Sequence, residues 1–187
     1  MSTNVPKSYL DLARSVIDTR IGAAKGVSRD DAIFGLISCT YVYSYSALLS
    51  FCSAQLYLIW TKDHSNLRQK YPSSQSFEHL MAGPLRGIKH AVKELNIQSG
   101  IQPLHEEEPK LWQTLNEFLT NYRNFFLHPN PELFNQYVGK TSNLQWQFPS
   151  KTVSEILAYI FKNTAGEVPN WVNETSLIAH GFEIKNI

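Results

Sequence analysis

The sequence has little cysteine, little charge, and little glycine or proline. Its 187 residues include two Cys, nine Gly and nine Pro, and 18% of them are charged. Two Cys exclude a disulfide-dense scaffold, and the scarcity of Gly and Pro beside 43% hydrophobic residues excludes disordered and collagen-like chains. The charged fraction is below the roughly 25% of an ordinary soluble domain, so we expect a partner to cover part of the surface. The length predicts a single domain over residues 1–187.

The formal net charge is only +1, which excludes a protein that acts mainly through a global electrostatic field. Contact with a nucleic acid must therefore come from a local basic cluster. The densest such cluster consists of Arg86, Lys89, His90 and Lys93. These four residues are candidates for holding an RNA backbone, although a cluster of this kind is also typical of a solvated helix face.

No pair of Cys or His has the spacing of zinc ligands, and we expect neither a metal nor a cofactor. Cys39 and Cys52 lie in one predicted helix and are roughly 20 Å apart at 1.5 Å per residue, so that helix cannot hold a disulfide between them. Both are expected to be buried thiols. The first residues contain no apolar core of the kind found in signal peptides, which predicts a cytoplasmic protein.

The longest uncharged stretch runs from Ala32 to Trp60, which is enough to cross a bilayer. Ser, Thr and Gln residues are spread along it, and Tyr41, Tyr43 and Tyr45 lie near its middle, where a lipid-facing span favours Leu or Ile. The composition favours a long central helix buried in its own protein over a membrane span.

Hydrophobic periodicity predicts an all-α bundle of about five helices. The predicted helices cover residues 7–24, 28–60, 77–95 with a break at Gly83-Pro84, a segment introduced by Glu106–Pro109 and ended by Pro129, and 153–162. Loops are expected over 62–76 and 96–104, and short strands are possible only near 144–148 and 181–184.

The helix that ends at Pro129 has the clearest apolar stripe in the chain, formed by Leu111, Trp112, Leu115, Phe118, Leu119, Tyr122, Phe125 and Phe126. At 100° per residue, Arg123, Asn124 and His128 fall on the flank and back of this helix, away from the stripe. His128 precedes a Pro, which places it at the helix exit. A permanent cation beside a group that titrates near neutrality can cleave RNA without a metal, since the imidazole moves protons and the guanidinium stabilises charge on the phosphate.

The sequence Arg123-Asn124-x-x-x-His128 resembles the R-N-x-x-x-H signature of the HEPN superfamily, a group of all-helical ribonucleases from toxin–antitoxin, abortive-infection and CRISPR systems. The resemblance implies a homodimer in which two motifs line one cleft and cleave single-stranded RNA without a metal, leaving a 2′,3′-cyclic phosphate. It assigns Arg123 to phosphate stabilisation, His128 to acid or base catalysis and Asn124 to orienting the site. It also implies an antitoxin or defence-system partner.

Other interpretations of these residues remain. Arg123 and His128 are also favoured at the end of a helix by its dipole, and a helical domain of this kind can bind a protein or a nucleotide without cleaving anything. Gly139-Lys140-Thr141 does not make a phosphate loop, because Phe134 stands where the first Gly is required. Trp112 and Trp146 are expected to be core residues rather than platforms for bases.

Overall fold

The computed structural model describes residues 4–18, 29–62, 65–127 and 148–173, and every regular element in those ranges is helical. The all-α prediction is confirmed for this part of the chain. The elements are α1 (Val5–Asp18), α2 (Arg29–Trp60), α3 (Asn66–Lys70), α4 (Phe77–Ala82), α5 (Ile88–Gln98), α6 (Leu104–Glu107), α7 (Pro109–Thr114), the π-helical segment η1 (Leu115–Thr120), α8 (Asn121–Leu127), α10 (Phe148–Thr164) and α11 (Asn170–Asn173).

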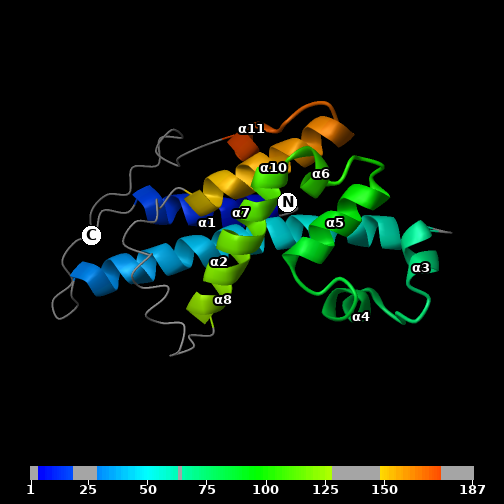
Figure 1. Ribbon diagram of the computed structural model, residues 1–187, viewed down its shortest axis with the longest axis horizontal. Coiled ribbons are helices and arrows are strands. Elements are labelled where there is room, and N and C mark those ends of the chain that lie inside the picture. The colour runs from blue at the N-terminus through cyan, green and yellow to red at the C-terminus, as the bar shows by residue number, and fades with distance from the viewer. Residues whose placement is uncertain (1–3, 19–28, 63–64, 128–147, 174–187) are drawn as a thin grey trace.

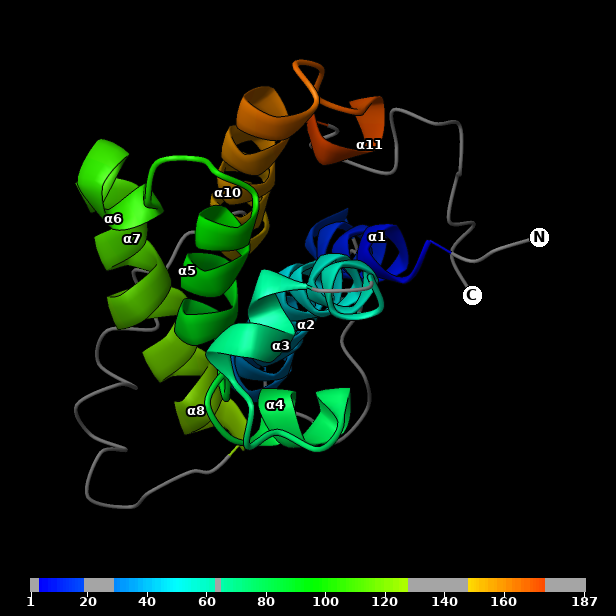
Figure 2. The ribbon, with the colours of Figure 1, turned by 90° about the vertical axis from the view of Figure 1, so that its right-hand side faces the viewer.

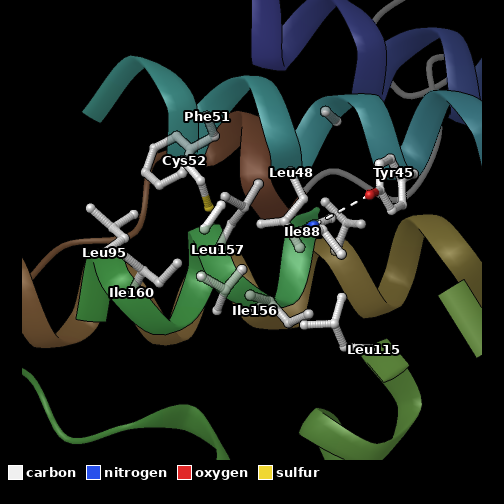
Figure 3. Packing of buried hydrophobic residues seen from close by; sticks show 14 of the residues in the cluster. Tyr45, Leu48, Phe51, Cys52, Ile88, Leu95, Leu115, Ile156, Leu157 and Ile160 are labelled. Carbon is white, nitrogen blue, oxygen red and sulfur yellow. Dashed lines mark hydrogen bonds between the residues drawn. The ribbon is translucent and has the colours of Figure 1, made fainter. Parts of the chain in front are cut away.

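The long helix α2 lies at the centre of the bundle (Figures 1 and 2). Helix α1 runs along one side of it, and α5, α8 and α10 pack against it from other directions. Its buried side chains include Tyr41, Leu48, Cys52 and Leu56, which meet core residues of α5, η1 and α10 in one apolar cluster (Figure 3). Burial raises the pKa of the Cys52 thiol to about 12, so this sulfur stays protonated and inert.

The segment Ser38–Trp60 of α2 is long and apolar enough to cross a membrane, with a mean hydropathy of 1.2. In the folded protein, 39% of its apolar 18-residue stretch is buried. Thr40 and Ser44, both fully buried, belong to the part of α2 that other helices cover. A core helix passes the same test, so a single span of this kind is weak evidence for a membrane protein.

Several predicted boundaries are wrong in the described residues. The loop expected over 96–104 is shorter, because α5 continues to Gln98 and α6 begins at Leu104. The loop expected over 62–76 contains α3, because the Ser65 hydroxyl accepts the Arg68 N–H at 3.1 Å and Leu67 is fully buried. The last long helix begins at Phe148 instead of Val153, with Pro149 in its first turn, where a missing N–H costs nothing. Phe148, the last residue of the possible strand at 144–148, is the first residue of α10. Residues 144–147 and the whole possible strand at 181–184 lie outside the described residues.

The two cysteines differ in environment. Cys52 is buried as predicted, but Cys39 is exposed and the prediction for it is wrong. Cys39 lies nearer the start of α2, while the side chains of α2 in the apolar cluster begin at Tyr41. In α1, Leu10 and Ala13 are fully buried.

A buried arginine joins α1 to the C-terminal part of the described chain. Arg14, 2% exposed, donates from Nη1 to the Trp171 carbonyl at 2.7 Å and from Nη2 to the Val172 carbonyl at 2.8 Å and to Ser154 Oγ at 3.1 Å. Asp11 adds a carboxylate oxygen 3.7 Å from Nη1. This one side chain therefore fixes the relative positions of α1, α10 and α11.

Replacing Arg14→Met should lower the free energy of unfolding by about 3 kcal/mol, because two buried carbonyls lose their charged donor. Urea denaturation of both proteins measures the difference. Lys151→Met is the control, since Lys151 is exposed and its ion pair with Glu155 spans 3.9 Å; its effect should stay below about 0.5 kcal/mol. Equal unfolding midpoints for Arg14→Met and wild type would contradict the structural role of Arg14.

A second polar cluster attaches α3 and the following turn to α5. The buried Glu94 accepts hydrogen bonds from Lys70 Nζ at 2.7 Å, Tyr71 Oη at 2.9 Å and Gln98 Nε2 at 2.8 Å. Burial alone would raise the pKa of Glu94, but the hydrogen bonds from Lys70, Gln98 and Tyr71 outweigh it and hold the pKa below its usual range. The cluster is satisfied, and it orients the exposed face of α5.

Because the folded pKa of Glu94 is lower than that of an unfolded Glu, about 4.3, its stabilising effect is complete above that pH and is lost as the pH falls through the folded pKa. Glu94→Gln should reduce the free energy of unfolding at pH 7 by about 2 kcal/mol and flatten its decline below pH 4.3. Denaturant titrations between neutral and acid pH test this. The exposed Glu155→Gln should change neither quantity appreciably.

Candidate functional site

The motif lies at the end of a helix that is not a uniform α-helix. Segments α7, η1 and α8 follow one another without a break, and η1 (Leu115–Thr120) is π-helical. Thr120 Oγ1 donates to the Leu115 carbonyl at 2.9 Å, five residues back. The expectation of a constant 100° step is therefore wrong over η1, whose wider turn changes where the following side chains point. Single π-turns of this kind are frequent at functional sites.

Buried residues on this helix hold the motif against α2. Leu115, Leu119 and Tyr122 are at most 4% exposed, as the apolar stripe predicts. The Tyr122 ring stacks on Tyr41 of α2, with centroids 5.4 Å apart and planes at 28°. Burial, and to a smaller extent the neighbouring Tyr122, raises the pKa of Tyr41 far above its usual range, so the Tyr41 hydroxyl stays protonated at neutral pH. Trp112 is half-buried and packs against the same core.

Arg123 and Asn124 lie side by side at the edge of this packing. The Arg123 guanidinium carbon is 4.6 Å from the centroid of the Tyr45 ring on α2, and Nη1 donates to Asn124 Oδ1 at 3.0 Å. Arg123 is half-buried and Asn124 is exposed. Within the described residues Arg123 makes no ion pair, so its charge is not neutralised by a neighbouring carboxylate. His128, the third residue of the motif, lies outside the described residues.

The predicted RNA-binding residues share one surface, which we call the basic face: Arg86, Lys89, His90 and Lys93. All four are exposed, and their spacing along α5 and the turn before it puts them on one side. His90 Nδ1 is 2.8 Å from the Arg86 carbonyl oxygen. No ion pair to a described acidic residue reduces their charge.

One side chain connects the motif to the basic face. The Oη atom of Tyr45 accepts a hydrogen bond from the backbone N–H of Ile88, the first residue of α5, at 3.2 Å (Figure 3). The ring of Tyr45 contacts Arg123. The start of α5 and the motif residue Arg123, which are far apart in the sequence, therefore both contact α2 at Tyr45. In the sequence Tyr45 is one of three tyrosines in an uncharged stretch, and no pattern distinguishes it from Tyr41 or Tyr43.

A cavity of about 640 Å³ lies elsewhere, between α1, α2, α4, α10 and α11. Its walls are mainly apolar, and the lining residues include the aromatic side chains of Phe51, Tyr57, Phe77, Phe161 and Trp171. No carboxylate, histidine or cation lines it. This cavity therefore lacks the groups needed for acid–base or phosphate chemistry.

The described residues contain no cluster of three or more His, Cys, Asp or Glu side chains able to hold a metal ion. Comparisons of the chain with protein-family models, curated proteins and solved structures find no match. The chemistry of the site must therefore be argued from its own side chains.

The basic face carries a stability cost that can be measured. Lys89 and His90 lie in the first turn of α5, where the helix dipole disfavours cations, and that turn has no acidic residue. Lys89→Glu should raise the free energy of unfolding by about 1 kcal/mol at low ionic strength and by less in 1 M salt.

Lys93→Glu is the matched control, because it also creates one Glu–Lys pair four residues apart but lies beyond the first turn, and it should gain only about 0.4 kcal/mol. Thermal or urea unfolding of the three proteins tests this. Equal gains for both variants would contradict the dipole argument.

Proposed function

We propose that the chain is a metal-independent endoribonuclease of the HEPN type that cleaves single-stranded RNA. The observation that carries the proposal is the position of Arg123: a half-exposed guanidinium without a described carboxylate partner, held against Tyr45 beside an exposed Asn124. An un-neutralised cation next to an amide that can still donate through Nδ2 suits an anionic ligand such as a phosphodiester.

The basic face supports the same substrate class. A chain with net charge +1 has no general attraction for RNA, so local cations must supply it. Arg86, Lys89 and Lys93 have exposed charges, His90 is exposed between them, and Tyr45 contacts both the first residue of α5 and Arg123. An RNA strand bound at Arg123 would have this face available for its flanking phosphates.

The reaction proposed is an internal transfer. The 2′-oxygen loses its proton to a base and attacks phosphorus, the bond to the 5′-oxygen breaks, and that oxygen takes a proton from an acid, giving a 2′,3′-cyclic phosphate and a 5′-hydroxyl. His128 supplies base or acid, and Arg123 stabilises the charge that grows on the phosphate. One imidazole has one protonation state at a time, so two copies of the site in a homodimer divide the roles.

In this proposal the protein acts in the cytoplasm, its substrate is RNA, and an antitoxin or other defence-system protein is its partner. It invokes no cofactor or metal and no insertion in a membrane. Size-exclusion chromatography with light scattering gives the oligomeric state directly, and a strictly monomeric protein would remove the shared site.

The alternative function is a non-catalytic helical interaction or nucleotide-binding module. The contacts that Arg123 makes within its own fold, to Tyr45 and Asn124, favour it, because they are also what a structural arginine makes. In that case Arg123→Ala would cost only the cation–π contact, about 1 kcal/mol of stability, and no activity would depend on it.

The purified protein should cleave a single-stranded RNA in excess EDTA and leave 2′,3′-cyclic phosphate ends, which mass spectrometry identifies. His128→Ala and Arg123→Ala should each reduce the cleavage rate at least 100-fold, because each removes a group used in the transition state. Circular dichroism should show all variants folded.

His79→Ala is the matched control, since His79 is exposed on α4 and belongs to neither the motif nor the basic face; it should cleave at the wild-type rate. Cleavage that survives His128→Ala, or that requires a divalent metal, would overturn the proposal. RNA or nucleotide binding without cleavage would favour the alternative.

A further inference from the structure

Tyr45 makes two contacts with two elements far apart in the sequence, although it is only 6% exposed. Its ring lies 4.6 Å from the Arg123 guanidinium carbon, and its hydroxyl oxygen lies 3.2 Å from the Ile88 nitrogen. Each contact uses a different part of the side chain. The ring and the hydroxyl can therefore be tested separately.

The hydroxyl contact defines where α5 begins. Gly87, the N-cap residue, has φ of 91° and no side chain that could accept hydrogen bonds from the first free N–H groups of the helix. The Tyr45 oxygen, from a different helix, accepts the N–H of Ile88 instead. The next two residues are Lys89 and His90, so the Tyr45 hydroxyl fixes the start of the basic face relative to α2.

The ring contact limits the positions open to Arg123. The negative face of an aromatic ring attracts a guanidinium, and a flat guanidinium lying on a ring keeps its N–H groups at its edges free to donate. One of these groups already binds Asn124. The ring thus presents Arg123 in one orientation and reduces the rotamer freedom that binding a phosphate would otherwise remove.

We propose that Tyr45 is the positioning residue of the RNA site: its ring orients Arg123 toward the scissile phosphate, and its hydroxyl holds the basic face in register with it for the flanking RNA. This inference rests on the proposed ribonuclease function and adds a residue that the motif does not contain. Tyr45 itself touches neither the reacting atoms nor the RNA.

The test separates the two contacts. Tyr45→Phe removes only the hydroxyl, and the loss of one hydrogen bond should raise KM roughly five-fold while kcat stays within two-fold of wild type. Tyr45→Leu also removes the ring and should lower kcat about ten-fold further. Tyr159→Phe is the matched control. Tyr159 lies on α10, and its hydroxyl also makes a hydrogen bond to a backbone group, the Gln102 carbonyl, at 2.7 Å. This variant should leave KM and kcat unchanged.

A double-mutant cycle distinguishes positioning from general loss of stability. If the hydroxyl acts through α5, the effects of Tyr45→Phe and Lys89→Ala on the Kd for an uncleavable 2′-deoxy oligonucleotide will be less than additive, because a displaced basic face has already lost part of the Lys89 contact. Additive effects, or a Tyr45→Phe protein with wild-type KM, would overturn the positioning role while leaving the ribonuclease proposal intact. A wild-type protein that neither cleaves nor binds RNA would overturn both.

Discussion

The burial of α2 is the constraint on which the rest of the structure depends. From Ala32 to Trp60 this helix carries no charged residue, and α1, α5, α8 and α10 pack around part of it. Because these helices share one partner, their relative positions are set by α2. Arg123 on α8 and the first turn of α5 both contact the same residue of α2, Tyr45.

Much of the fold could be predicted from the sequence because burial and periodicity are local signals. The stripe from Leu111 to Tyr122, the break at Gly83-Pro84 and the extent of α2 all follow from residue spacing and helix punctuation. The helix α3 could not, since it depends on a Ser65 cap and on one buried side chain, Leu67, in a stretch that is otherwise polar. Segment η1 could not either, because the same stripe fits a regular α-helix.

The sequence predicts the parts of the candidate site but not how they are assembled. Arg123 and Asn124 were identified from a motif, and the basic face from charge density, but spacing along a chain says nothing about which of two exposed surfaces adjoin. That information is carried by long-range contacts such as Tyr45 with Ile88, 43 residues away. Arg14 was missed for the same reason: its partners, the carbonyls of Trp171 and Val172, lie 157 and 158 residues away and carry no side-chain signal.

The hydrogen bonds of Arg14 also bear on the order in which the helices pack while the protein is synthesised. Its acceptors belong to α10 and α11, so the guanidinium of the first helix stays without its final partners until almost all of the described chain has been synthesised. Burying that charge earlier would be costly, because an ion without partners in a low-dielectric interior is strongly disfavoured. We therefore expect α1 to dock onto α10 and α11 only after α11 has been synthesised, which makes the packing of the two ends of the described chain a late step in folding.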